Sequence, residues 1–144
     1  MTDPDRRLLI SLKPNFAEAI LNGSKTIELR RTRPRISVPT EALIYATSPR
    51  CAVVGTCQVV EVLENTPFGM WRAHGRHASI RYPAYKAYFE NCDTAYGLVI
   101  VEPRALDHPI TLKHIRTAWR DFQPPQSFRY ISTATSDLVL AIAG

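Results

Sequence analysis

Two charged side chains stand two residues apart in segment 25–30, which reads Lys-Thr-Ile-Glu-Leu-Arg. Polar and apolar residues alternate here, which predicts a half-buried strand with Ile27 and Leu29 turned inward. Glu28 and Arg30 then share the opposite face. On that face Arg30 could bind a phosphate, and Glu28 could accept a hydrogen bond or act as a general base. The alternative is a solvated salt bridge between them.

Lys25 begins this strand, so we expect its side chain to extend from the rim into a cleft; a simple rim lysine is the alternative. The preceding turn, Gly23 to Thr26, has a superficial likeness to a phosphate loop. It lacks the earlier glycine and leads into a strand, where a phosphate loop leads into a helix, so nucleotide triphosphate hydrolysis is excluded. As polar groups at a cleft, Lys25 and Arg30 should each be replaceable by alanine at a stability cost of no more than about 1 kcal/mol.

Basic residues are concentrated in the same region. The chain has 18 basic and 13 acidic residues, a net charge of +5, and five of the basic residues fall between Lys25 and Arg35 with one acid among them. Such clustering is what binding to a phosphate backbone requires, because each neutralised phosphate releases counterions. A basic edge strand that resists aggregation is the competing interpretation.

Two further groups have functional side chains. Tyr45, on a predicted strand 42–46, is either a core residue or a tyrosine that stacks on a base or donates a proton. Segment 126–130 combines amide, hydroxyl, guanidinium and aromatic groups, the mixture that single-stranded RNA recognition uses, although it could equally be a packed connection. The candidate catalytic residues are Lys25, Glu28, Tyr45 and Ser127. The candidate RNA-binding residues are Lys13, Arg30, Arg31, Arg33, Arg35, Arg50, Gln126 and Arg129.

No metal or cofactor is expected. His74 and His77 have a spacing compatible with metal binding on a helix, but the surrounding arginines oppose a cation and no acidic ligand is adjacent. The three cysteines are an odd number without a Cys-x-x-Cys pair, so neither a disulfide framework nor a cysteine zinc site is predicted. Tyrosines and a phenylalanine in segment 82–89 are interpreted as helix packing.

The elements that must position these side chains follow from hydrophobic patterning and turn residues. A helix beginning at Pro14 should end at Gly23, and Thr111 should cap another. The last apolar run, 138–142, fits a strand or a helix equally, and 124–127 is a loop. Besides segment 25–30, strands are predicted at 8–12, 42–46, 52–63 with a bend at Gly55, and 96–101, and an irregular or helical insert at 67–91 with a helix from about Pro83. These strands suggest a sheet that curls toward a barrel.

Segments 11–14 and 20–30 together resemble the signature of the ASCH domain, a PUA-like family with a proposed link to RNA. The resemblance continues through 42–47, 53–55, 88–90 and 124–128 and so spans most of the chain. It implies an α+β fold, a small PUA-like β-barrel with flanking helices, formed as a single domain by residues 1–144. It also implies a cleft near the Gly-x-Lys-Thr turn that receives a nucleotide or RNA.

Three functions remain in view. The first is an RNA-binding protein that acts as a ribonuclease on single-stranded RNA through a basic cleft. The second is an amidohydrolase of a modified nucleoside such as N4-acetylcytidine: in some ASCH proteins a lysine, a threonine and a glutamate do this chemistry. Lys25 matches that lysine, but Glu28 occupies the threonine position and segment 72–79 offers no counterpart of the glutamate. The third is a noncatalytic RNA-linked regulatory protein.

Length and composition agree with one globular domain, because 144 residues with 45% hydrophobic and 22% charged residues fit the ordinary folded class. No apolar run approaches the roughly 20 residues of a membrane helix. Residues 1–7 place acids before arginines and lack the long apolar run of a secretory signal, so we expect a cytoplasmic protein.

Overall fold

The structure, a computed structural model, describes residues 5–143. Residues 1–7 were interpreted as unlike a secretory signal, and the first four of them lie outside the described part. Its strands are β1 (Arg6–Leu12), β2 (Ile27–Arg30), β3 (Thr40–Ala46), β4 (Ala52–Asn65), β5 (Ala95–Thr111) and β6 (Phe128–Ser132). Its helices are α1 (Pro14–Leu21), α2 (Pro67–His74), the 3-10 turn η1 (Gly75–His77), α3 (Tyr82–Tyr88), α4 (Leu112–Ala118) and α5 (Thr133–Ala143). No helix among the described residues combines the length and apolar character needed to cross a membrane.

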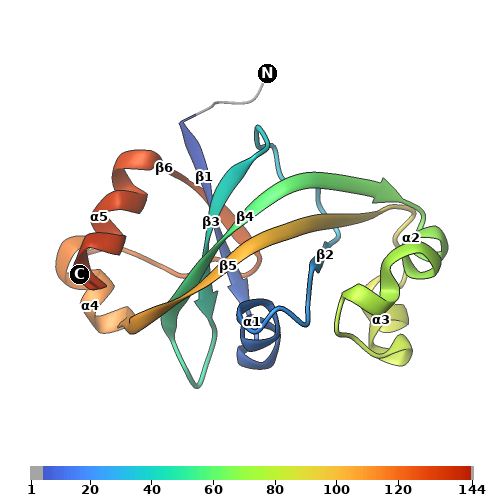
Figure 1. Ribbon diagram of the computed structural model, residues 1–144, viewed down its shortest axis with the longest axis horizontal. Helices are drawn as coiled ribbons and strands as arrows, with labels where there is room; N and C mark the ends of the chain where they lie inside the picture. The colour runs from blue at the N-terminus through green and yellow to red at the C-terminus, as the bar shows by residue number, and fades with distance from the viewer. Residues whose placement is uncertain (1–4, 144) are drawn as a thin grey trace.

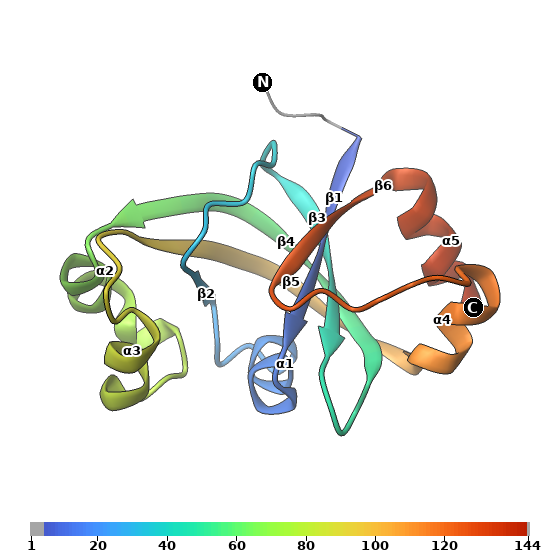
Figure 2. The same cartoon turned by 180° about the vertical axis from the view of Figure 1, so that it is seen from behind.

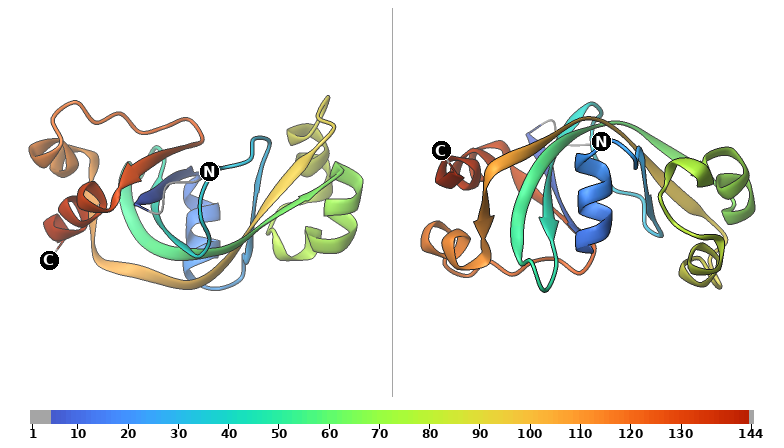
Figure 3. Two further views of the ribbon diagram at one scale, coloured as in Figure 1. Left: turned by 90° about the horizontal axis from the view of Figure 1, so that it is seen from above. Right: turned by 60° about the horizontal axis from the view of Figure 1, so that its bottom comes forward.

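One six-stranded sheet, ordered β2-β5-β4-β3-β1-β6, forms the centre of the fold. β1 and β3 run parallel and the other neighbours run antiparallel. The sheet curves strongly, and helices lie at its two ends and beneath it (Figure 1 and Figure 3). The expected α+β fold with flanking helices is confirmed. Within residues 5–143 the edge strands β2 and β6 are not paired with each other, so the barrel of the prediction is an open, curved sheet.

β4 and β5 form a long two-stranded ribbon whose register runs from Ala52 opposite Thr111 to Asn65 opposite Ala95. The insert with α2 and α3 lies at one end of this ribbon, and α4 and α5 lie at the other (Figure 1). Register shifts bend the ribbon, one of them next to Gly55. A Cβ atom at Gly55 would come within 2.5 Å of the Arg104 carbonyl oxygen. The bend predicted at Gly55 is therefore present, and it lets the two strands approach closely.

Three apolar clusters stabilise the fold, and each covers a different part of the sheet. One packs α1 against the middle strands, with Ile10, Ile20 and Ile44 fully buried. A second lies between the opposite face and α4 and α5, and the third holds the insert against β2. Because β1 alternates, Leu8 and Ile10 belong to the first cluster and Leu9 to the second.

The helix beginning at Pro14 is observed, and Gly23, just beyond its end, has a φ of +86°. Thr111 caps α4 by accepting a hydrogen bond from the backbone N–H of His114. Residues 138–142 lie in α5, which settles the open choice in favour of a helix. Segment 128–132 is strand β6, where no strand was predicted, because Phe128 pairs in register with Ile10 and packs on the first cluster. The segment between α4 and β6 runs back beside the end of β1 (Figure 2).

Candidate functional site

Lys25, Glu28 and Arg30 form a buried ion-paired row. Lys25 Nζ lies 3.1 Å from Glu28 Oε1, and Arg30 Nη2 lies 2.9 Å from Glu28 Oε2. The three residues are 3%, 4% and 9% exposed. Glu28 thus engages one cation with each carboxylate oxygen, and the row as a whole has a net charge of +1. Because the three charges are buried and paired, the row is not the solvated salt bridge that the sequence left as an alternative.

Strand β2 positions this row through its alternation. Ile27 and Leu29 enter the apolar cluster of the insert, as the sequence pattern predicts. Glu28 and Arg30 share the other face, but that face is buried where the pattern implied partial exposure. Lys25 lines a cleft as predicted, but it does so as an enclosed side chain and not from an exposed rim.

The insert encloses Lys25 through three contacts with segment 24–26. Lys25 Nζ donates a hydrogen bond to the Ala78 carbonyl oxygen. The backbone N–H of Thr26 donates to the His77 carbonyl oxygen at 2.9 Å, and Ser79 Oγ donates to the Ser24 carbonyl oxygen at 3.3 Å. The segment between η1 and α3 is therefore part of the wall around the charged row.

Burial lowers the pKa of the Lys25 ammonium below its ordinary value, since the charged form loses hydration. The neighbouring Glu28 carboxylate opposes this by attraction and by a hydrogen bond, and the Arg30 charge adds to the lowering. Lys25 is therefore a better proton donor than a lysine in water.

A cavity of about 660 Å³ opens over the charged row, and we call it the β2 cleft. This volume lies within the roughly 300–1,000 Å³ of small-molecule sites. Its lining mixes apolar side chains with the charged row and with polar groups from the end of β1 and from the loop before β6. The lining residues are Ser11, Leu12, Lys13, Phe16, Lys25, Glu28, Leu29, Arg30, Thr47, Ile80, Ala84, Ala87, Tyr88 and Gln126.

Two buried polar atoms of this lining have no hydrogen-bond partner within the described part of the chain: Ser11 Oγ and Arg30 Nε. A buried donor without a partner is destabilising by about 1–3 kcal/mol. Both atoms belong to residues that line the same cleft.

Several of the predicted RNA-binding residues surround the β2 cleft. Lys13 and Gln126 line it and are exposed. Arg31 is also exposed, and its guanidinium carbon lies 4.6 Å from the ring centroid of Tyr88, which is part of the lining. These three residues form a polar and basic rim.

The other arginines lie apart from the cleft lining. Arg33 forms an exposed ion pair with Glu64 at 3.4 Å. The carbonyl oxygen of Arg35 accepts a hydrogen bond from Arg6. Arg129 packs over the ring of Trp119 at 4.6 Å, and Arg50 is exposed in the turn between β3 and β4. The structure therefore brings together only part of the basic group that the sequence suggested.

Tyr45 and Ser127 lie on either side of Ser11, away from the charged row. Tyr45 is the register partner of Ser11 in the β1–β3 pair, and the Ser11 backbone N–H donates to the Ser127 carbonyl oxygen at 2.9 Å. Tyr45 is 2% exposed and packs edge-on against Phe122. Burial, followed by its interaction with Cys51, raises the pKa of Tyr45 to about 12, so the phenol is protonated at neutral pH.

Ser11 is the residue that sequence reasoning missed, although it stands inside the segment that carries the family resemblance. Its carbonyl oxygen accepts a hydrogen bond from Arg30 Nη2 at 3.0 Å, and so it joins the charged row to the Tyr45 and Ser127 pair. Nothing in the alternation of β1 distinguished it from a core serine. Among residues 5–143, no three His, Cys, Asp or Glu side chains gather as metal ligands would.

A curved mixed sheet with a charged row on its edge strand defines the class to which the chain belongs. Residues 10–106 match the ASCH domain, and the chain is a member of the ASCH domain family. A relative named ASCH domain-containing ribonuclease, from Zymomonas mobilis, is 35% identical over 133 residues, which cover 91% of this chain and 89% of that protein.

Solved structures agree with this assignment. The crystal structure of an ASCH protein from Zymomonas mobilis has a TM-score of 0.90 and 29% identity, and the match covers 96% of each chain. Structures of two variants of the Zymomonas protein match similarly, with TM-scores of 0.90 and 0.89. In one of them a serine is replaced by alanine, and in the other a tyrosine is replaced by phenylalanine.

Proposed function

We propose that this ASCH protein is a ribonuclease that binds single-stranded RNA and holds one unpaired nucleotide in the β2 cleft. The observation that carries the proposal is the pair of unpartnered polar atoms, Ser11 Oγ and Arg30 Nε, among the residues that line a cavity with a buried ion-paired row. The ribonuclease name of the Zymomonas relative supports the reaction class.

The lining favours a nucleotide through its mixture of surfaces. Phe16 and Tyr88 provide aromatic walls on which a base could stack. Lys13 and Arg31 at the rim would contact the phosphates on either side. Because a paired base exposes neither face, a deep site of this kind selects unpaired strands.

Cleavage of the RNA backbone requires a proton acceptor, a proton donor and positive charge near the phosphate. Glu28 is the proposed acceptor of the 2′-hydroxyl proton as that oxygen bonds to phosphorus and the bond from phosphorus to the 5′-oxygen breaks. Lys25 and Arg30 are the proposed cations that stabilise the charge on the phosphate. When Arg30 binds a phosphate, its ion pair with Glu28 is weakened. One carboxylate oxygen of Glu28 is then free to accept a proton. Tyr45 and Ser127, which flank Ser11 of the cleft lining, are the proposed hydroxyl donors, and the departing 5′-oxygen takes its proton from one of them.

The two Zymomonas variants support the inclusion of this second pair. The replaced tyrosine and serine in that chain are separated by one residue fewer than Tyr45 and Ser127 are here. We take Tyr45 and Ser127 as their counterparts.

The amidohydrolase alternative is disfavoured by the same charged row. Glu28 stands where amidohydrolases of the family would have a threonine, and its carboxylate is held between two cations. A carboxylate in that place would repel the anionic intermediate of amide hydrolysis. We therefore expect N4-acetylcytidine to be hydrolysed slowly or not at all.

The test is a cleavage assay with end-labelled single-stranded RNA, the matching duplex, the DNA of the same sequence and N4-acetylcytidine, each with and without EDTA. The parent protein should cleave the single-stranded RNA alone and should be insensitive to EDTA. Glu28→Gln, Tyr45→Phe and Ser127→Ala should each cleave about 10²–10⁴-fold more slowly. Efficient acetylcytidine turnover without RNA cleavage would reverse the order of the two functions, and full cleavage by any variant would remove that residue from the mechanism.

A further inference from the structure

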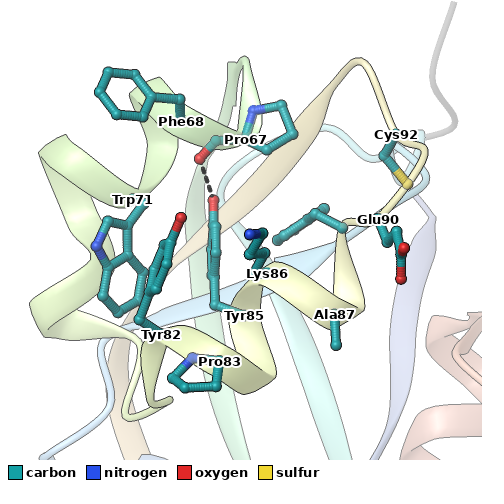
Figure 4. Close-up of a pocket in the computed structure, with 11 residues that line it drawn as sticks. Pro67, Phe68, Trp71, Tyr82, Pro83, Tyr85, Lys86, Ala87, Glu90 and Cys92 are labelled. Atoms are coloured by element: carbon teal, nitrogen blue, oxygen red, sulfur yellow. Dashed lines mark hydrogen bonds between the residues drawn. The ribbon is translucent and has the colours of Figure 1, made fainter.

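The insert carries a second cavity, distinct from the β2 cleft, and five of its eleven lining residues are aromatic (Figure 4). It measures about 510 Å³ and lies between α2 and α3. Its lining includes Phe68, Trp71, Tyr82 and Tyr85, with Lys86 beside them. The sequence pattern suggested helix packing for the aromatic residues of segment 82–89. That holds for Tyr85 and Phe89, which are 2% and 3% exposed, but not for Tyr82, which is 48% exposed.

Two aromatic side chains of this cavity face solvent. Phe68 is 68% exposed and Tyr82 is 48% exposed, and they are the only aromatic residues among the largely exposed hydrophobics of residues 5–143. Trp71 lies beside Tyr82, with ring centroids 5.1 Å apart, and beside Tyr85, at 4.8 Å. Exposed aromatic groups that gather in one place mark a binding surface.

Contacts between α2, α3 and η1 hold the rings of Tyr85 and Trp71 in place. Tyr85 donates its hydroxyl hydrogen to the Pro67 carbonyl oxygen at 2.6 Å, which ties α3 to α2 (Figure 4). The Trp71 ring packs so closely on Gly75 that a Cβ atom there would lie 2.6 Å from it. A preformed site loses little conformational entropy on binding.

The insert as a whole is basic, although the cavity lining itself carries one lysine and one glutamate, Lys86 and Glu90. Segment 67–92 contains four basic residues and one acid, a net charge of +3. The guanidinium carbon of Arg72 lies 5.7 Å from the centroid of the Phe68 ring. A hydrophobic protein partner would not need this charge, whereas a nucleic acid strand presents both flat bases and phosphates.

The aromatic cavity adjoins the β2 cleft in two places. Ala87 lines both cavities, so α3 is a shared wall. A hollow of about 430 Å³ that includes Arg72 and Arg76 touches Trp71 on one side and Ile80, which also lines the β2 cleft, on the other. A strand with one nucleotide in the β2 cleft could therefore pass over α3 or along the arginines to reach Trp71.

We propose that the aromatic cavity of the insert is a second RNA subsite, in which Phe68, Trp71 and Tyr82 stack unpaired bases of the strand whose cleaved nucleotide occupies the β2 cleft. This subsite rests on the proposed function and adds to it a preference for strands long enough to span both cavities. Basic side chains of the insert neutralise the intervening phosphates.

The test compares a dinucleotide with a dodecanucleotide, both of 2′-O-methyl uridine so that neither is cleaved. In Phe68→Ala/Tyr82→Ala, affinity for the dodecanucleotide should fall by about 5- to 150-fold for each base that no longer stacks, while dinucleotide affinity stays unchanged. Leu138→Ala, which truncates a 50% exposed apolar residue on α5, is the matched control and should change neither affinity.

Trp71 supplies an independent signal. In a Trp119→Phe background it is the only tryptophan of the chain, and its fluorescence should be quenched by the dodecanucleotide but not by an abasic strand of the same length and charge. Equal dodecanucleotide affinity of the double variant and the parent, or equal quenching by the abasic strand, would overturn the subsite. The subsite would also be overturned if the parent protein were a dimer that Phe68→Ala converts to a monomer while RNA affinity stays the same. A parent that binds neither oligonucleotide would instead overturn the proposed function, and the subsite with it.

Discussion

Arg30 and Ser11 join two strands that are not neighbours in the sheet. Arg30 Nη2, on the edge strand β2, donates a hydrogen bond to the Ser11 carbonyl oxygen on β1 at 3.0 Å. Three strands separate β2 from β1 in the sheet order. The open sheet is therefore bridged across its concave side by a side chain, and the same guanidinium is ion-paired with Glu28.

We predict that Arg30→Gln lowers the free energy of unfolding by about 3–5 kcal/mol, because it leaves the buried Glu28 with one fewer partner and removes the bridge to Ser11. This cost is larger than the limit of about 1 kcal/mol that the sequence predicted for Arg30 as a polar group at a cleft. Arg33→Gln is the control, since Arg33 forms an exposed ion pair and should change stability by less than about 1 kcal/mol. Urea titration of both variants is the measurement. Equal midpoints for the two would mean that the Arg30 bridge contributes nothing to stability.

Lys25 should give the stability a measurable dependence on alkaline pH. Its pKa is lowered in the folded protein, so between that pKa and 10.5 the unfolded chain binds more protons than the native protein does. Stability therefore rises with pH through this window relative to a chain without the lysine. The difference in unfolding free energy between the parent and Lys25→Met should change in the parent's favour as the pH approaches 10.5. A difference that stays constant across this range would contradict a lowered pKa.

Cys57 should resist alkylation in the native protein. It is 1% exposed, and burial, reinforced by the Glu28 and Glu41 carboxylates, raises its pKa to about 12. Cys51 and Cys92 are partly exposed. Iodoacetamide treatment followed by mass spectrometry should modify these two cysteines first, and Cys57 only after denaturation. Rapid modification of Cys57 in the folded protein would show that the interior near β4 opens readily.

RNA affinity should decrease with salt, with a log–log slope of about −0.7 for each phosphate contact. Because Arg33 is already paired with Glu64, its loss should change the slope less than the loss of Arg31, which lies beside Tyr88 at the cleft. Filter binding of Arg31→Ala and Arg33→Ala at several salt concentrations compares the two. Identical slopes for the parent and Arg31→Ala would mean that Arg31 makes no phosphate contact.

The sequence predicted local features well where one residue type decides the outcome. Gly23 after a helix, Thr111 before one and Gly55 in a long strand each act through their own backbone or side chain, and all three behave as expected. The sequence did not predict β6, because its pairing with β1 depends on distant residues and its pattern alone also fits a loop. Nor did it predict the burial of Glu28 and Arg30, since alternation assigns a face but cannot say what covers it.

The sequence predicted only the part of the candidate site whose residues are close together in the chain. The residues adjacent in sequence, Lys25, Glu28 and Arg30, do come together. The tyrosine and serine that complete the proposed catalytic set lie around Ser11, and only the strand pairing brings these distant segments together. The aromatic cavity was hidden, since spacing on a helix does not distinguish Tyr82, which is exposed, from Tyr85, which is buried.

The hydrogen bond from Lys25 to the Ala78 carbonyl gives the insert a chemical as well as an architectural role. Insertions and deletions in the segment between two strands are commonly tolerated without effect on the rest of the fold. Here the insert supplies one of the groups that hold the ammonium of the charged row. A chimera that carried the insert of another ASCH protein would thus change the surroundings of the Lys25 ammonium together with the surface of the insert.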